Sequence, residues 1–474
     1  MSTRFVLPEQ PVDEDILGSK AAIHDLVSRG MNTVIARYGK NEGYPWIDTK
    51  FSTVDGLDFP AADPERGLDA VFSWIQGRGL EAVAEHYAFI PPDSEAAEKY
   101  RALLRGVSRA LRLARTEGSG HLYFSMDAAG RPRRPRPKAT VSTLSDIFCS
   151  RGLYAAARAL GDEDAAAEAE RYCLETFDAV MRGDYQSDQQ AFDPKNPVLP
   201  IPGRLSHAPF MLLLPTARLL LRETESGWAE RALSCIRHIL SLHVVGGETG
   251  SDTTRGLRQG DFIEFIDNRG TPFRSDGRIL CDPGHALEFV GLAAGFLRTL
   301  RFEFPAWEHR EESEKIYGTL QNIFRRNFVN GYDEEHGGIV KLYDLESREA
   351  VNPDMPWWSL PETMRAAVEC LVVSQSEEER AFLRSAYARS WNALTGNYLT
   401  EAGKGLCVQT RDGTGKISDA VPAVPDADPC YHTGLSLLAC LKLIDQVSIL
   451  NVTTIRAPGA DSNRALPPSS SVNS

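Results

Sequence analysis

Two side chains with acid–base chemistry stand at the start of one expected helix, in the stretch CDPGHALEF at 281–289. Asp282 is a good N-cap residue and Pro283 suits the first helical position, so a helix should begin here. His285 and Glu288 are three residues apart and therefore share a face of that helix. Histidine exchanges protons near neutral pH, and the helix dipole is expected to favour its neutral, proton-accepting form. A capped helix with a structural histidine is the alternative.

An arginine stands inside the helix expected over residues 67–88. Arg78 follows Trp74 and Gln76 and has small and apolar neighbours. Such a guanidinium either pairs with a carboxylate on a neighbouring helix or points into a central cavity. The sequence leaves both arrangements open.

A carboxylate follows two tryptophans at the start of another expected helix. Glu362 comes after Trp357 and Trp358. It could form a capping box with Ser359, with the tryptophans serving as packing residues. Its other role would be to face a cavity beside them.

Two further histidines stand at expected helix starts. His432 follows Tyr431 near the C-terminus, and His207 lies just inside the sixth expected helix. Lone histidines in such places are more often structural than catalytic. No metal is expected, since His238 and His243 are five residues apart and do not share a helix face. The chain also lacks the motifs of serine hydrolases, P-loop proteins and Rossmann folds.

Apolar residues at helical spacing define the elements that must position these groups. The spacing predicts twelve helices, at about 18–38, 67–88, 93–117, 141–160, 163–181, 205–222, 226–243, 284–301, 307–328, 358–375, 377–396 and 430–446. Aromatic–Asp–Gly turns at 123–132, 265–272 and 331–343 predict short β-hairpins between them. Residues 1–17 should form a loose lead-in, and the Pro/Ser/Asn-rich residues 449–474 a disordered tail.

No charged or proline-rich break divides these helices, which fits one all-α domain over residues 18–448. We expect an (α/α)6 barrel, a toroid of six helical hairpins with the β-hairpins at one rim; a two-domain helical array is the alternative. If successive helices alternate in direction, every even-numbered helix starts at the same rim. These helices carry the polar groups at 206–207, 285–288, 362 and 432. The toroid would gather them over one cavity suited to a small ligand.

The overall charge narrows the range of partners. A net charge of −13 over 474 residues argues against nucleic acid or an anionic membrane as the main partner. The basic run at 131–138 is expected to be a solvated loop, with a phosphate contact or nuclear signal as the minority alternative. Eight cysteines without a CxxC pair, no leader segment and no membrane span predict a cytoplasmic protein with reduced thiols.

Motifs spread along the chain resemble, in order, those of the N-acylglucosamine 2-epimerase family, which includes cellobiose 2-epimerases and mannose-type aldose–ketose isomerases. The resemblance spans residues 20–446 and rests on WIQGR at 74–78, FSMDAAGRP at 124–132, PGHALE at 283–288, YDEEHGG at 332–338, WWSLPE at 357–362 and YH at 431–432. It implies an (α/α)6 barrel with the active site in its central cleft, acting on a sugar without a cofactor.

The resemblance also implies roles for individual residues. Arg78 matches the family's cleft arginine, and His285 and His432 match its two acid/base histidines. Glu288 and Glu362 match carboxylates that assist them. The residues expected to contact the substrate are Trp74, Gln76, His207, Trp357, Trp358 and Tyr431.

The implied chemistry explains why such a set is needed. Removing the C2 proton of an open-chain aldose gives an enediolate, so the site needs a base and an acid, and two imidazoles can exchange these roles. Arg78 and helix N-termini would stabilise the oxyanion. Histidines on opposite faces give the C2 epimer, whereas one base that carries the proton to C1 gives the ketose. The sequence does not separate these outcomes.

The chain departs from the family pattern at several positions. Leu435 stands where many relatives have an arginine, Met355 and Asp428 stand at or near the places of lysines, and Gly291 replaces a tryptophan. These changes indicate a different sugar or weakened catalysis. Two alternatives therefore stay open. One is an inactive sugar-binding or regulatory protein, and the other is a glycoside hydrolase or lyase that uses Glu288 and Glu362. Nucleotide regulation and subunit number, with a homodimer as one option, also stay open.

Overall fold

The computed structural model describes residues 4–134, 141–190, 192, 201–222, 224–225, 227–246 and 256–447. Within these ranges the α-helices are α1 (Asp13–Gly18), α2 (Lys20–Arg37), α3 (Ser73–Tyr87), α4 (Glu95–Glu117), α5 (Leu144–Leu160), α6 (Glu163–Met181), α7 (Ala208–Leu219), α8 (Gly227–Leu242), α9 (Pro283–Glu303), α10 (Arg310–Gly331), α11 (Ser359–Leu371), α12 (Glu377–Ala393) and α13 (Ser436–Leu443). From α2 onward, every one of them matches a helix expected from the apolar spacing. None of the described helices is long and apolar enough to cross a membrane.

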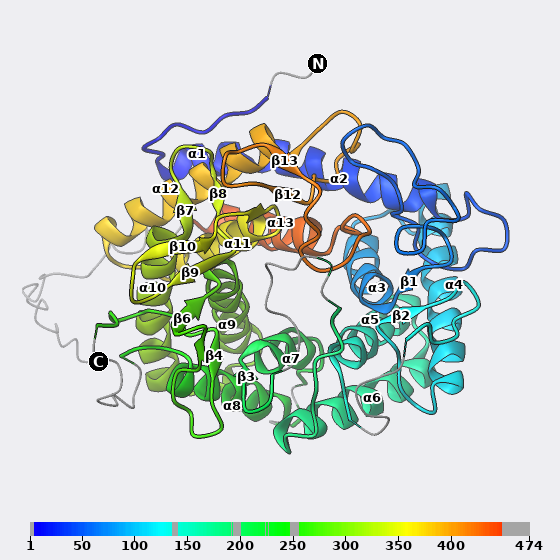
Figure 1. Cartoon of the computed structure of the whole chain (residues 1–474), viewed down its shortest axis with the longest axis horizontal. Helices are drawn as coiled ribbons and strands as arrows, with labels where there is room; N and C mark the ends of the chain where they lie inside the picture. The colour runs from blue at the N-terminus through cyan, green and yellow to red at the C-terminus, as the bar shows by residue number, and fades with distance from the viewer. Residues whose placement is uncertain are drawn as a thin grey trace, which may run out of the picture.

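The helices are arranged as two concentric rings (Figure 1). The inner ring consists of α3, α5, α7, α9, α11 and α13, and each contacts the next. A π-helical turn, η4 (Tyr431–Leu435), leads into α13 and contacts α3, which closes the ring. The other helices from α2 to α12 lie outside. This architecture is the (α/α)6 barrel that the alternation of helices predicts.

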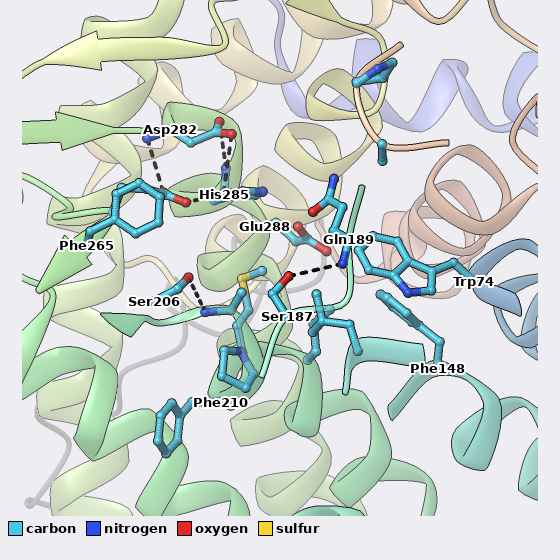
Figure 2. A pocket seen from close by; sticks show the side chains of 18 of the residues that line it. Trp74, Phe148, Ser187, Gln189, Ser206, Phe210, Phe265, Asp282, His285 and Glu288 are labelled. Carbon is cyan, nitrogen blue, oxygen red and sulfur yellow. Dashed lines mark hydrogen bonds and ion pairs between the residues drawn. The ribbon is translucent and has the colours of Figure 1, made fainter. Parts of the chain in front are cut away.

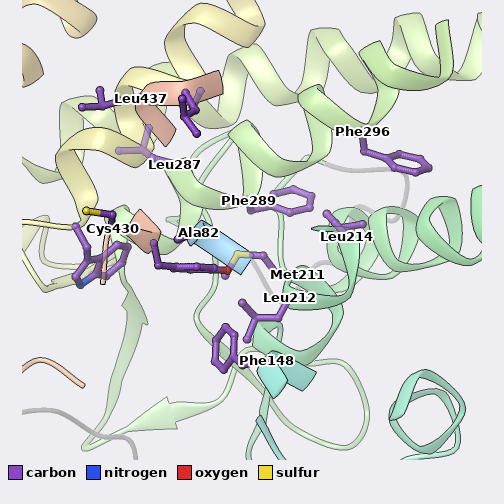
Figure 3. Packing of buried hydrophobic residues seen from close by; sticks show 14 of the residues in the cluster. Ala82, Phe148, Met211, Leu212, Leu214, Leu287, Phe289, Phe296, Cys430 and Leu437 are labelled. Atoms are coloured by element: carbon purple, nitrogen blue, oxygen red, sulfur yellow. The ribbon is translucent and has the colours of Figure 1, made fainter. Parts of the chain in front are cut away.

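Burial differs between the two rings as their positions require. The inner helix α9 buries residues on all sides, including Phe289 and Phe296. The outer helix α4 buries one apolar stripe only, with charged residues on its other side. Figure 3 shows Phe289 and Phe296 of α9 beside Met211 and Leu214 of α7, part of the packing that joins neighbouring inner helices.

Short strands stand directly before four inner helices. They are β1 (Val71–Phe72) before α3, β3 (Leu205–Ser206) before α7, β6 (Arg278–Cys281) before α9 and β11 (Met355–Pro356) before α11. β1 pairs with β2 (Ser125–Met126), and β3 pairs with β4 (Phe265–Ile266). β5 (Arg274–Ser275), β6, β9 (Leu342–Asp344) and β10 (Glu349–Asn352) form one sheet, and β11 to β13 (Thr410–Arg411, Ile417–Ser418) form another. The strands therefore fix where these inner helices begin.

The three expected turns close as the Asp–Gly pattern indicates. β7 (Tyr332–Asp333) pairs with β8 (Gly338–Ile339) in a hairpin. The other two turns close through the isolated bridges Met126–Pro132 and Ile266–Pro272, while their strands pair mainly with segments that precede inner helices.

One expectation about the chain ends needs revision. Residues 1–17 are not a loose lead-in throughout, because they include α1, whose Asp13 binds Arg380 at 2.7 Å and Arg384 at 3.0 Å. In the basic run, Arg131 and Arg134 form surface ion pairs with Asp127 and Glu65. Residues 135–138 of that run and the tail at 449–474 lie outside the described residues.

Candidate active site

One cavity of about 460 Å³ lies at the centre of the ring, and four of the expected catalytic residues line it. These are Arg78 from α3, His285 and Glu288 from α9, and His432 from η4. Figure 2 shows His285 and Glu288 on one side of this space and Trp74 and Phe148 on the other. The volume suits a small ligand. The toroid thus brings together side chains that are up to 354 residues apart in the sequence, from Arg78 to His432.

His285 is held by carboxylates at the start of α9. The Asp282 side chain accepts hydrogen bonds from the backbone N–H groups of Gly284 and His285, at 3.0 and 3.3 Å, as its N-cap position predicts. The Nδ1 atom of His285 lies 3.0 Å from Glu264 Oε1 and 3.4 Å from Asp282 Oδ2. A ring that donates from Nδ1 has its Nε2 atom available for substrate.

Glu264 was not identified from the sequence, although it is the main partner of His285. Its backbone N–H donates to Leu280 O at 2.9 Å, which places it beside the residues that lead into α9. Its second oxygen, Oε2, lies 3.2 Å from His207 Nε2. Burial disfavours its charged form, but His285 and His207 hold the pKa of this carboxyl well below its ordinary value. Glu264 is therefore an anion shared by two histidines.

These carboxylates reverse the expected protonation of His285. Burial favours the neutral ring, yet Asp282 and Glu264 outweigh burial and raise the pKa of His285 above its ordinary value. The expectation that the helix dipole keeps this ring neutral was wrong, because two anions at close range act more strongly than a partial charge at a helix end. His285 is suited to donate a proton.

His432 is held by one carboxylate from α11. Its Nδ1 atom lies 2.9 Å from Glu362 Oε1, and Arg365 binds the other oxygen of Glu362. The capping box considered for Ser359 and Glu362 does not form, since the Ser359 hydroxyl donates to Pro356 O at 2.8 Å instead. Glu362 orients the histidine rather than capping its own helix.

The turn that carries His432 is not the regular α-helix start that the sequence indicates. Residues Tyr431–Leu435 form a π-helical turn, and Cys430 before it has φ = 63°. The Asp428 carboxylate accepts backbone hydrogen bonds from Tyr431, His432 and Thr433 at 3.1 to 3.4 Å. Asp428, noted above as a departure from the family's lysine, thus caps the turn that presents His432.

The surroundings of His432 favour its neutral form. Burial lowers the pKa of His432 to about 4, and the nearby positive charge of Arg78 adds to this effect. With Nδ1–H donated to Glu362, the neutral ring has its lone pair on Nε2. His432 is suited to accept a proton, in contrast to His285.

Both histidines contact the same tryptophan. The Trp358 ring stacks on His285 at 5.2 Å between centroids and lies 5.6 Å from His432. Lys341, which the sequence did not single out, lines the cavity, donates to Asp282 Oδ2 at 2.5 Å and stands 5.2 Å above the Trp358 ring. It places a positive charge in the wall of a site where Met355 takes the place of a family lysine.

Of the two arrangements that the sequence allowed for Arg78, an ion pair or a position at the cavity, the structure shows the second. No ion pair joins it to a carboxylate in the part of the chain that the structure describes, and its buried Nε atom has no hydrogen-bond partner there. Its guanidinium instead lies among the rings of Phe148, Trp74 and Tyr431, at 4.2, 5.2 and 5.2 Å. Burial lowers the pKa of Arg78, which remains a cation at the cavity wall.

The expected substrate contacts divide into two groups. Trp74, Trp357 and Trp358 line the cavity. Three others lie behind its wall, each held by another part of the protein. Gln76 binds both backbone groups of Ile47, His207 binds Glu264, and the Tyr431 hydroxyl accepts from Arg151. These three support the lining rather than forming it.

Two sets of side chains could offer ligands to a metal ion. His207, Glu264 and His285 form one, and Glu288, Glu362 and His432 form the other, each with ligand atoms within 4.8 Å of one another. In both sets, the Nδ1 atom of one histidine faces a carboxylate, which leaves its Nε2 atom to act as a base, an acid or a ligand.

The ring of hairpins defines an (α/α)6 barrel, and two carboxylate-bound histidines line the cavity at its axis. The family model of N-acylglucosamine 2-epimerase (GlcNAc 2-epimerase) matches residues 153–435, more than half of the chain. The protein therefore belongs to the N-acylglucosamine 2-epimerase family. Comparison with curated proteins finds no match.

Solved structures of sugar-converting enzymes share the fold. A D-mannose isomerase matches with a TM-score of 0.65 at 15% identity, over 90% of this chain and 98% of the other. The cellobiose 2-epimerase from Bacillus thermoamylovorans B4167 gives 0.64 at 15% identity, over 90% and 100%. A sugar epimerase from a ruminal bacterium gives 0.63 at 14% identity, over 88% and 97%. At these identities the likeness concerns the fold.

Proposed function

We propose that the protein is a sugar 2-epimerase or aldose–ketose isomerase that moves the C2 proton of an open-chain aldose. One observation carries the proposal. Two imidazoles, each bound through Nδ1 to a carboxylate, line one cavity that also contains an arginine without a carboxylate partner among the described residues. Membership of the family and the folds named above support the same class of reaction.

The first step uses the neutral histidine. The Nε2 lone pair of His432 accepts the C2 proton, and the electron pair of the C–H bond moves toward C1 to give the enediolate. Glu362 stabilises the imidazolium that forms, because its carboxylate faces Nδ1–H at 2.9 Å. Glu288, which lines the cavity, is placed to help open the pyranose ring beforehand by accepting its hydroxyl proton.

The second step uses the protonated histidine. His285 donates its Nε2 proton to C2 from the opposite face, which inverts that carbon and gives the epimer. If His432 instead returns its proton to C1, the product is the ketose. Arg78 stabilises the negative charge of the enediolate in both cases, and a buried cation without an anionic partner does so most strongly.

The departures from the family pattern motivate a second candidate, a sugar-binding protein without catalysis. Leu435 supplies no charge where many relatives have an arginine. Against this candidate, Arg365 binds Glu362 and Lys341 binds Asp282, so each histidine centre has a cation beside its carboxylate. A hydrolase that uses Glu288 and Glu362 is disfavoured because Glu362 does not line the cavity and is engaged by His432 and Arg365.

Incubation with N-acetylmannosamine, mannose, glucose and cellobiose in D2O tests the proposal. Deuterium at C2, followed by NMR together with an epimer or ketose product, is the expected result for at least one sugar. The product also decides between epimerase and isomerase. Binding of a sugar without C2 exchange would favour the second candidate, and release of new reducing ends would favour a hydrolase.

A further inference from the structure

A second buried arginine lies directly behind the side chains that line the cavity. Arg151, on α5, is completely buried and does not line the cavity. Its guanidinium donates in three directions: Nε to Glu81 Oε2 at 2.6 Å, Nη1 to Leu212 O at 2.8 Å and Nη2 to the Tyr431 hydroxyl at 2.5 Å. These acceptors belong to α3, α7 and η4, so one side chain joins four inner elements of the ring.

Tyr431 connects this arginine to the groups that face the substrate. Its ring lies 5.2 Å from the Arg78 guanidinium and 4.9 Å from the ring of His432. Arg151 also stands 5.5 Å from the ring of Phe148, whose distance to Arg78 is 4.2 Å. Both arginines therefore lie close to the same two aromatic rings.

The two guanidinium groups have different partners. Glu81 neutralises Arg151 inside the wall, and its negative charge contributes to raising the pKa of Arg151 although burial opposes this. Arg78 has no direct ion pair with a carboxylate among the described residues; it lies among aromatic rings at the cavity, with Glu288 and Asp428 near enough to act on its charge. Tyr431 is held at its hydroxyl, so its ring is a fixed surface against which Arg78 and His432 rest. A fixed cation stabilises developing charge without reorganisation during the reaction.

We propose that Arg151 is a positioning residue, which fixes Tyr431 and through it sets the place of Arg78 and His432. The inference rests on the proposed function, since it assigns Arg151 to the same reaction without contact with the substrate. It predicts that weakening this hydrogen bond affects catalysis more than binding.

Two variants address the hydroxyl and the arginine separately. Tyr431→Phe keeps the ring and removes only the acceptor of Arg151. Arg151→Lys keeps a positive charge near Glu81 but cannot hold three partners in a planar fork. Arg380→Lys is the matched control, because Arg380 is also buried and donates to Asp13, Leu371 O and Val447 O away from the cavity.

Two readouts separate positioning from simple structural support. In C2-exchange assays, both test variants should lose about tenfold to hundredfold in kcat with little change in KM, which is the cost of misplacing a catalytic group. In NMR titrations, the imidazole of His432 should titrate at a higher pH than in the wild-type protein, because Arg78, which lowers its pKa, no longer stands as close. Arg380→Lys should lower thermal stability only.

Among the described residues, the charged side chains that act on His432 are Arg78, Glu288, Glu362, Arg365 and Asp428. If the test variants lose only thermal stability, as the control does, and keep kcat and the His432 titration, Arg151 is structural and the inference is overturned. If the wild-type protein exchanges no C2 proton, the proposed function fails, while the titration still decides whether Arg151 positions His432.

Discussion

The two histidine centres look alike in their direct contacts and differ in their protonation. In each, Nδ1 faces a glutamate, at 3.0 Å for His285 and 2.9 Å for His432, and each ring contacts Trp358. Yet the pKa of His285 is raised, whereas that of His432 is lowered to about 4. The nearest partner therefore does not set the charge of these rings.

The difference in pKa arises from the charged groups that surround each histidine–glutamate pair. His285 has a second carboxylate, Asp282, at 3.4 Å, and 26% of its side chain is exposed. His432 is only 8% exposed, has Arg78 nearby, and shares its glutamate with Arg365. The surroundings of His285 thus favour the protonated ring, and those of His432 favour the neutral ring with a free lone pair. This is the pair of states that a single proton transfer across a sugar requires.

Removal of either imidazole should have the largest effect. His285→Gln and His432→Gln should each lower epimer or ketose formation by about 10²-fold to 10⁴-fold, the range for loss of a general acid or base. Product formation in D2O, followed by NMR, measures this. His309→Gln is the matched control, since His309 also binds a glutamate, Glu230 at 2.9 Å, but on the surface. Equal losses in the control, or full activity in either test variant, would contradict the assignment.

Replacement of either glutamate by glutamine should change the protonation of one histidine and leave the other unchanged. Glu264→Gln removes one of the anions that raise the pKa of His285, so the alkaline fall of the rate should begin at a lower pH than in the wild-type protein. Glu362→Gln should leave this alkaline limb in place, because Glu362 contacts only His432 of the pair. Rates measured between pH 4 and 9 check this. An identical change of the pH profile in both variants would show that the centres are not independent.

The smallest effect is on the free energy of unfolding. As the pH falls, the two histidines should change this free energy in opposite directions. His432 titrates near 4 when folded and near 6.5 when unfolded, so the unfolded state binds the extra proton and stability falls between these values as pH decreases. Between pH 6.5 and 5 this costs roughly 2 kcal/mol, which His432→Gln should remove. His285 has a raised pKa, so it stabilises the fold below pH 6.5 and His285→Gln should increase acid sensitivity. Chemical denaturation at pH 5 and 7 measures both, and slopes of the same sign would contradict the comparison.

The sequence predicted most helix positions well, because a helix that is buried on one face has apolar residues at regular intervals along the chain. The start of α3 did not, since residues expected in the helix from 67 onward include strand β1. The π-helical turn at Tyr431–Leu435 was also missed, because an additional residue in a turn leaves no mark in apolar spacing. α1 was missed because it is short and held by ion pairs with α12.

The cavity residues followed from family motifs, but their partners did not. Glu264 reaches His285 through backbone pairing near β6, and Lys341 reaches Asp282 from the segment before β9. Such contacts depend on which strands pair at the rim of the barrel, and a local sequence pattern does not predict this pairing. Glu264 stands directly before the aromatic turn at 265–272, and that position was the only available signal.

The pH dependence of C2 deuterium exchange by the wild-type protein tests the central claim most directly. The base must be neutral and the acid protonated, so activity should rise through the pKa of His432 near 4 and fall through that of His285 above its ordinary value. The exchange rate should therefore have a bell-shaped pH profile. Its acid limb should be lost in His432→Gln and its alkaline limb in His285→Gln. Exchange that is independent of pH from 4 to 9, or limbs that survive in both variants, would contradict it.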